Sequence, residues 1–188
     1  MSVTINNSPV HSEIMISYPY GEIDAGYSCG WHTGVDFVPH GTTENNPILY
    51  PVETGTVVYI SNDPNQSLGC QVQILGSTSR KYWRYCHMVQ NSIQVSVNDP
   101  VSLSTPLGRM GATGNVTGRH LHLELSTTQT WQCASFENPC TALGIPNVDN
   151  TVIEYGGSPT PPTPTPAYKK NPFPWVLYAS KLRNKRGN

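Results

Sequence analysis

Polar and apolar residues alternate with a period of two along residues 118–125, Gly-Arg-His-Leu-His-Leu-Glu-Leu. This period is typical of a half-buried β-strand, so the three leucines are predicted to face the core. His120, His122 and Glu124 then share the opposite face. Two imidazoles on one strand face can offer nitrogens to a single metal centre, although a solvated polar face would show the same pattern.

Short apolar runs separated by turn residues precede this strand. Residues 48–52 and 55–60 are predicted to form two strands joined by a tight turn, and residues 70–75 and 80–88 two more. Residues 1–28, by contrast, resemble an irregular lead-in. Regular strands with short connections predict a mainly β fold, an antiparallel sheet folded into a sandwich or open barrel.

The chain of 188 residues is long enough for one domain of ordinary size plus appendages. We expect the domain at residues 1–155, with its core at about 18–130, and one short helical turn at 138–144. A Pro- and Thr-rich stretch at 156–167 is predicted to be a semi-rigid, polyproline-like linker. A basic tail follows at 168–188.

Charge is unevenly distributed along the chain. Six of the eleven basic residues lie in the tail, which leaves five against all twelve acidic residues in the body, a net charge of −7. Such a body is a poor nucleic-acid binder, because contacts with phosphate need clustered Lys and Arg. The tail suits either an anionic partner, such as a wall polymer, a membrane surface or another protein, or a solvated end.

Neither a secretory signal peptide nor a transmembrane segment is predicted. The first ten residues lack a charged start and an apolar core, and no run approaches the roughly 18 apolar residues that span a bilayer. We therefore expect release by lysis or by assembly into a particle if the protein acts outside the cell.

The five cysteines form no C-x-x-C pair, which argues against a zinc finger or a thioredoxin-like motif. Cys133 and Cys140 are close enough in sequence to bridge a short loop. Whatever the pairing within the chain, an odd count leaves at least one free thiol.

A second candidate for metal binding is His32-Thr-Gly-Val-Asp36. A separation of four keeps both side chains on one side of an extended or helical backbone. With one histidine from residues 118–125, the pair gives two imidazoles and one carboxylate, a ligand set of catalytic zinc sites. The pattern H-x-x-x-D also fits a helix N-cap or a surface turn. Non-haem iron oxygenases use similar ligands, but usually with H-x-D spacing.

His87 ends the aromatic-rich run 80–88. On its own it is more typical of a structural histidine. A hydrolytic zinc site, however, needs a proton acceptor near the water and a donor near the developing oxyanion. His87 and the spare histidine of His120 and His122 suit these two tasks. Tyr82, Trp83 and Tyr85 suit either a groove or the core, and because Trp83 and Tyr85 share a face with His87 by alternation, the groove is favoured for these two.

Three motifs, in this order, resemble the lysostaphin-type (LytM-like) zinc endopeptidases that cut peptidoglycan. They are residues 32–36, residues 85–87 (Tyr-Cys-His) and residues 114–124, and the run 51–58 also matches. The resemblance covers roughly residues 18–130. It implies a mainly antiparallel β domain whose site lies in a groove flanked by loops.

The resemblance also implies a role for each motif residue. The H-x-x-x-D pair and the second histidine of H-x-H would bind zinc, which makes His32, Asp36 and His122 the ligands. The first histidine of H-x-H and the histidine of Tyr-Cys-His, His120 and His87, would be catalytic. Every group that the family pattern requires is present, which favours an active enzyme.

Two positions depart from that family's pattern. Arg119 precedes His120 where a proline is usual, and it would place a cation beside the groove. Cys86 precedes His87 where a small residue is common, and it either packs or pairs with Cys70. Neither departure removes a functional side chain.

The predicted function is zinc-dependent hydrolysis of peptide bonds in peptidoglycan cross-links at the bacterial cell wall. A phage tail or virion-associated lysin is the context we expect, with the linker and tail contacting other phage structural proteins. Glycine-rich bridges and D-Ala to diamino-acid links are both candidate substrates. The alternative is a non-catalytic wall-binding or structural module of a phage particle or division complex.

Overall fold

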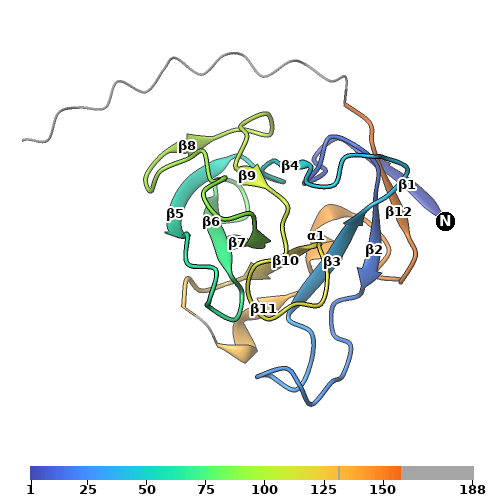
Figure 1. Cartoon of the computed structure of the whole chain (residues 1–188), viewed down its shortest axis with the longest axis horizontal. Coiled ribbons are helices and arrows are strands. Elements are labelled where there is room, and N and C mark those ends of the chain that lie inside the picture. Colours follow the sequence, from blue (N-terminus) through green and yellow to red (C-terminus); the bar gives the residue numbers. More distant parts are fainter. Residues whose placement is uncertain (131, 158–188) are drawn as a thin grey trace, which may run out of the picture.

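Most of the strands in the computed structural model join one large sheet, which runs in the order β1-β12-β2-β3-β10-β7-β6-β5-β8, with β11 paired to β10 (Figure 1). The described residues are 1–130 and 132–157, so the predicted tail and the linker from residue 158 lie outside them. The strands of this sheet are β1 (Ser2–Ile5), β2 (Ile14–Tyr18), β3 (Gly34–Pro39), β5 (Gly55–Ser61), β6 (Cys70–Gly76), β7 (Tyr82–Met88), β8 (Pro100–Val101), β10 (Leu121–Ser126), β11 (Phe136–Glu137) and β12 (Val152–Tyr155).

The remaining elements are short. Strands β4 (Ile48–Leu49) and β9 (Gly108–Arg109) form a separate two-stranded sheet. A 3₁₀ turn, η1 (Cys133–Ser135), precedes β11, and the helix α1 (Pro139–Leu143) follows it. The Asn138 side chain caps α1, and Gly144 ends it in the left-handed conformation, as is common at helix C-termini. The predicted helical turn is thus confirmed.

Strand pairing confirms a mainly β fold and changes two details. Every pairing in the large sheet is antiparallel except that of β1 with β12, which is parallel, so the sheet is mixed. Residues 1–28 contain β1 and β2, so their prediction as an irregular lead-in was wrong. Their strand character depends on pairing with β3 and β12, which are distant in sequence.

The predicted hairpin of residues 48–52 and 55–60 does not form. Strand β5 pairs with β6 and β8, whereas β4 pairs with β9. Pro51 follows β4 and has no backbone N–H to donate, so the first run ends after two residues. Neighbours in sequence are therefore placed in different sheets.

Strand β10 lies in the interior of the large sheet, between β3 and β7. Leu121, Leu123 and Leu125 are buried in the core, as the alternation predicts. The opposite face is buried as well, because His122 and Glu124 are only 5% and 1% exposed. The strand is therefore buried on both faces, not half-buried as predicted.

The groove prediction for Trp83 and Tyr85 was wrong, since both rings belong to the hydrophobic core. Cys86 and His87 of β7 together oppose a single residue of β6, and His87 has a positive φ of 58°. This β-bulge breaks the alternation, so His87 emerges on the face opposite the two rings. A sequence period of two cannot reveal an inserted bulge residue.

Neither of the two candidate disulfides, Cys133–Cys140 and Cys70–Cys86, forms, and Cys86 is buried as a free thiol, which agrees with the alternative that it packs. Cys29 and Cys133 form a disulfide across a sequence separation of 104 residues. Cys140 is buried in the core as a free thiol within α1. Cys70 faces the core and Cys86 faces away from it on β7, so these two free thiols do not meet. Within the described residues no helix is long and apolar enough to cross a membrane.

Candidate metal centre and its cleft

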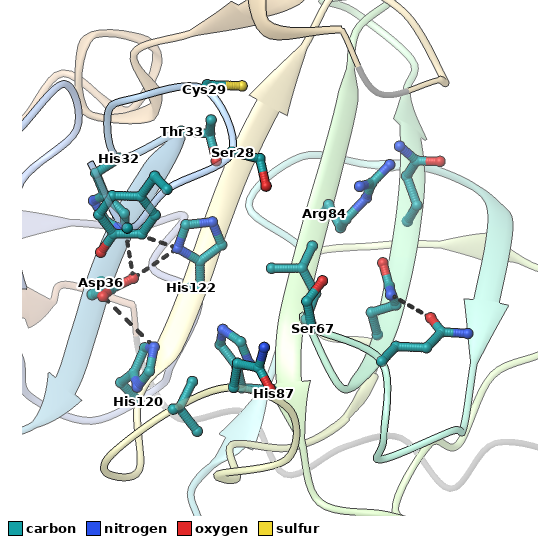
Figure 2. Close-up of a pocket in the computed structure, with 18 of the residues that line it drawn as sticks. Ser28, Cys29, His32, Thr33, Asp36, Ser67, Arg84, His87, His120 and His122 are labelled. Atoms are coloured by element: carbon teal, nitrogen blue, oxygen red, sulfur yellow. Dashed lines mark hydrogen bonds and ion pairs between the residues drawn. The ribbon is translucent and has the colours of Figure 1, made fainter. Parts of the chain in front are cut away.

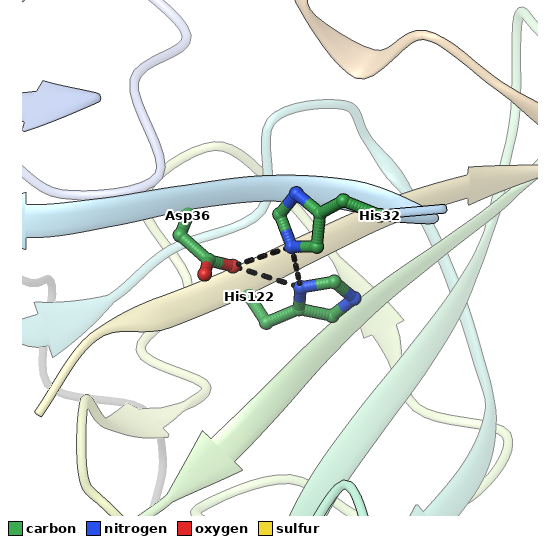
Figure 3. Close-up of side chains that lie close together, drawn as sticks. All are labelled: His32, Asp36 and His122. Atoms are coloured by element: carbon green, nitrogen blue, oxygen red, sulfur yellow. Dashed lines mark hydrogen bonds and ion pairs between the residues drawn. The ribbon is translucent and has the colours of Figure 1, made fainter. Parts of the chain in front are cut away.

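Three side-chain atoms converge on one point between β3 and β10 (Figure 3). His32 Nε2 lies 3.0 Å from His122 Nδ1 and 3.1 Å from Asp36 Oδ1, and His122 Nδ1 lies 2.8 Å from the same oxygen. A tetrahedral zinc ion with bonds of about 2.0–2.1 Å would space neighbouring donor atoms by about 3.3 Å. The donor set and its spacing therefore fit zinc.

Strand register places two of these side chains next to each other. His122 of β10 pairs directly with Asp36 of β3, so both project from the same face. His32 lies just before β3, four residues from Asp36. Between them, a Cβ on Gly34 would come within 2.5 Å of the Leu123 carbonyl oxygen and 2.8 Å of His122 Cε1. Glycine at this position allows β3 to approach the imidazole.

Outer contacts fix which nitrogen each imidazole presents. His32 Nδ1 lies 2.8 Å from the Pro19 carbonyl oxygen, to which it donates, and this leaves Nε2 free as a ligand. His122 Nε2 lies 3.1 Å from Glu124 Oε1, so Nδ1 is the nitrogen that points toward Asp36 and His32. Glu124 is therefore a buried partner of an imidazole, not a surface carboxylate.

Hydrogen bonding dominates the electrostatics of the trio. Burial alone would raise the pKa of Asp36, but hydrogen bonds from His122 and His32 hold it well below its usual range. Burial opposes the charge on His122, yet Asp36 and Glu124 raise its pKa to about 10. The metal-free site thus holds a proton on His122 at neutral pH, which a metal ion would have to displace.

Two further histidines face the trio (Figure 2). The ring of His87 lies 4.8 Å from that of His120 and 5.9 Å from that of His122, measured between centroids. His87 Nδ1 donates to the Thr113 carbonyl oxygen at 2.8 Å, so its Nε2 is the free acceptor. Burial, followed by the charges of His122 and His120, lowers the pKa of His87 to about 3, which keeps this ring neutral.

His120 stands beside the carboxylate of the trio. Its Nε2 is 3.6 Å from Asp36 Oδ2, and its Nδ1 donates to the Gly118 carbonyl oxygen at 3.0 Å. His120 is more exposed than His122, with 16% of its side chain accessible against 6%. It is therefore the histidine of the H-x-H motif that an incoming molecule reaches first.

All five of these side chains line one open cleft of about 1100 Å³. Four loops flank it: residues 26–33 before β3, 66–68 before β6, 115–117 before β10, and 129–130 after β10. The Cys29–Cys133 disulfide joins the first of these loops to the segment that follows the last. Two of the segments at one end of the cleft are thus joined covalently.

Residues 30–133, just over half of the chain, match the model of Peptidase family M23. The chain belongs to peptidase family M23. Lysostaphin of Staphylococcus simulans is 26% identical over 164 residues, which cover 87% of this chain but 30% of lysostaphin. The chain thus spans under a third of that relative's length.

Solved M23 structures share the fold. The catalytic domain of the antimicrobial peptidase lysostaphin superposes with a TM-score of 0.57 at 24% identity, covering 71% of this chain and 92% of that domain. LytU gives 0.53 at 27% identity, covering 68% and 83%. The catalytic domain of the prophage-encoded M23 protein EnpA from Enterococcus faecalis, in a mutant form, gives 0.50 at 25% identity, covering 67% and 88%. The predicted family and the loop-flanked β fold are confirmed.

Sequence reasoning found the five M23 motif residues that meet in this cleft, and their individual roles remain predictions. It missed Tyr27, whose ring centroid lies 5.2 Å from that of His32. Burial, followed by the negative charge of Asp36, raises the pKa of Tyr27 to about 12. It also missed Arg84, which lines the cleft, and it favoured Arg119, which is exposed and does not. Once the bulge at His87 is known, alternation along β7 would have found Arg84.

Proposed function

We propose that this M23 chain is a zinc-dependent endopeptidase that hydrolyses peptide bonds in peptidoglycan cross-links. The observation that carries the proposal is the convergence of His32 Nε2, Asp36 Oδ1 and His122 Nδ1, with two more histidines, at one point in an open cleft. The similarity to lysostaphin, described as an antimicrobial peptidase, supports a bacterial target. Action at the cell wall follows from that substrate.

The proposed ligands are His32, Asp36 and His122. Zinc bound by them would polarise a carbonyl and lower the pKa of water. The Pro19 carbonyl oxygen and the Glu124 carboxylate orient the two imidazoles, so little reorganisation is needed when the metal binds. The two imidazoles are buried and the Asp36 side chain is 14% exposed, which limits competition from solvent.

His87 and His120 are the proposed catalytic residues. One accepts the proton of the attacking water, and the other donates a hydrogen bond to the developing oxyanion and a proton to the leaving amine. His87 presents an unprotonated Nε2, since its Nδ1 donates to Thr113. His120 faces the same space from the other side (Figure 2).

The decisive experiment is solubilisation of purified peptidoglycan by the whole chain. We expect release of new amino termini, its loss with a zinc chelator, and its return when zinc is added back. Wall binding without release would favour the non-catalytic module instead. Association with a phage tail through the linker and the basic tail stays a prediction.

A further inference from the structure

Arg84 is the one lysine or arginine among the described residues that line the cleft. It projects from β7 on the face opposite Tyr85 and reaches the space beside His122 (Figure 2). Its side chain is only 6% exposed. Burial of a guanidinium is costly unless a carboxylate pairs with it, and the buried Glu124 of β10 provides that carboxylate.

The contacts of Arg84 leave its charge close to the cleft. Its Nη1 is 3.7 Å from Glu124 Oε2, too long for a hydrogen bond, and its Nη2 donates to the Gln129 carbonyl oxygen at 3.4 Å. Glu124 Oε1 is already engaged, since it accepts from Thr33 Oγ1 at 2.6 Å and contacts His122 Nε2 at 3.1 Å. One carboxylate is thus shared between Arg84 and an imidazole.

The side chains around Arg84 are carboxamides. Gln73 of β6 is its direct cross-strand partner, and Gln71 lies two residues away on the same strand. Both line the cleft. A guanidinium flanked by amide donors suits a ligand that carries negative oxygens, above all a carboxylate, to which arginine can donate two parallel bonds.

The strand register shows how far Arg84 is offset along the sheet from the proposed ligand His122. His122 of β10 pairs with Cys86, and Glu124 pairs with Arg84, so Arg84 lies two residues along the sheet from the ligand. At 3.3–3.4 Å per residue the offset along the strand direction is about 7 Å, and the two strands are about 4.8 Å apart. An extended peptide covers the same span with about two residues.

We propose that Arg84 is a specificity-determining residue that recognises a free carboxylate of the substrate within two residues of the scissile bond. The inference rests on the proposed function and narrows its substrate class. A link through a diamino acid that has two carboxyl groups carries such a carboxylate, whereas a link through a lysine side chain and the interior of a polyglycine bridge do not. The chain is therefore assigned to cross-links of the first kind.

Two synthetic cross-link peptides test this, identical except that the diamino acid carries a free carboxylate in one and a carboxamide in the other. For the zinc-loaded wild type we expect kcat/KM about 10- to 100-fold higher for the carboxylate peptide. Arg84→Gln should bring the ratio close to one while still cleaving the carboxamide peptide, and Arg84→Lys should keep part of the preference. Arg109→Gln is the matched control, because Arg109 is exposed and pairs with Glu44 outside the cleft.

Each outcome decides a different question. Equal cleavage of both peptides by the wild type overturns the inference and leaves the proposed function standing, and so does cleavage of neither peptide by a protein that still solubilises peptidoglycan. Failure to solubilise peptidoglycan counts against the proposed function itself. An unchanged ratio in a folded Arg84→Gln variant, verified by its thermal unfolding, also overturns the inference. The wild-type comparison needs no variant, so misfolding of Arg84→Gln does not prevent the test.

Discussion

At the scale of the residue, the centre depends on which nitrogen each histidine presents. His32 offers Nε2 and His122 offers Nδ1, and in each case a buried oxygen holds the other nitrogen. The histidines themselves could be found from spacing and family resemblance. Their ligand atoms could not, because they depend on Pro19 and Glu124, whose oxygens reach the rings only in the folded chain.

The two histidines of the H-x-H motif should respond differently to removal. His122→Ala is expected to lose bound zinc and turnover together, since it deletes one of three ligand atoms. His120→Ala should retain zinc and lose turnover by about 10²-fold or more, as expected for a proton-transfer group. Zinc analysis of both purified variants beside the wild type checks this, and equal metal loss in both would contradict the assignment.

Zinc binding should release a proton. In the metal-free site the pKa of His122 is raised to about 10, because the pull of Asp36 and Glu124 outweighs burial. The ligand nitrogen is thus protonated below that pH, and zinc affinity should rise about tenfold per pH unit between pH 7 and 9. Calorimetric titration in buffers of different ionisation enthalpy measures the proton count, and a count of zero would rule out this competition.

At the scale of the element, β10 is the strand that alternation describes best, and its leucines are buried as predicted. The bulge in β7 escaped prediction, because a histidine with positive φ has no distinct sequence signature. The first two strands escaped for another reason. They are stabilised by pairing with strands far away in sequence, and local composition does not record such partners.

Close approach of β3 to β10 predicts that Gly34→Ala is damaging. The new Cβ would lie 2.5 Å from the Leu123 carbonyl oxygen, a backbone atom that cannot move freely. We expect a loss of about 1–3 kcal/mol in the free energy of unfolding, together with weaker zinc binding. Urea unfolding measures the first quantity. Gly118→Ala is the control, since nothing lies within 4 Å of its Cβ, and equal losses in both variants would refute the steric argument.

At the scale of the whole molecule, the strand order assembles the site from segments that are far apart in sequence. His32 and Asp36 reach His122 because β3 and β10 are neighbours in the sheet. Strands β1 and β12 pair at one edge, which brings the first residues of the chain beside residues 152–155. The motifs and the fold class could be predicted, but the disulfide could not, since its cysteines meet only through this arrangement.

The number of cysteines that react with a thiol reagent should show whether the core is intact and whether the disulfide has formed. The free cysteines are Cys70, Cys86 and Cys140, all buried, and burial raises the pKa of Cys140 to about 12. We expect no reaction with a thiol reagent in the native protein, three equivalents after denaturation, and five after denaturation with reduction. Rapid labelling of the native protein would show that these sites are exposed. Four equivalents or more without reductant would show that the disulfide is absent.

The disulfide between Cys29 and Cys133 makes the stability of this protein depend on the redox state of its surroundings. A bond that closes a loop of about 100 residues restricts the unfolded chain by about 4–5 kcal/mol in the chain-entropy model. Such bonds persist in oxidising environments and are rare in a reducing cytosol. In a reducing compartment the disulfide would open, and the chain would lose much of this stabilisation together with the covalent link at one end of its cleft. The redox state of its surroundings would therefore set how firmly the two segments at the end of the cleft are held together.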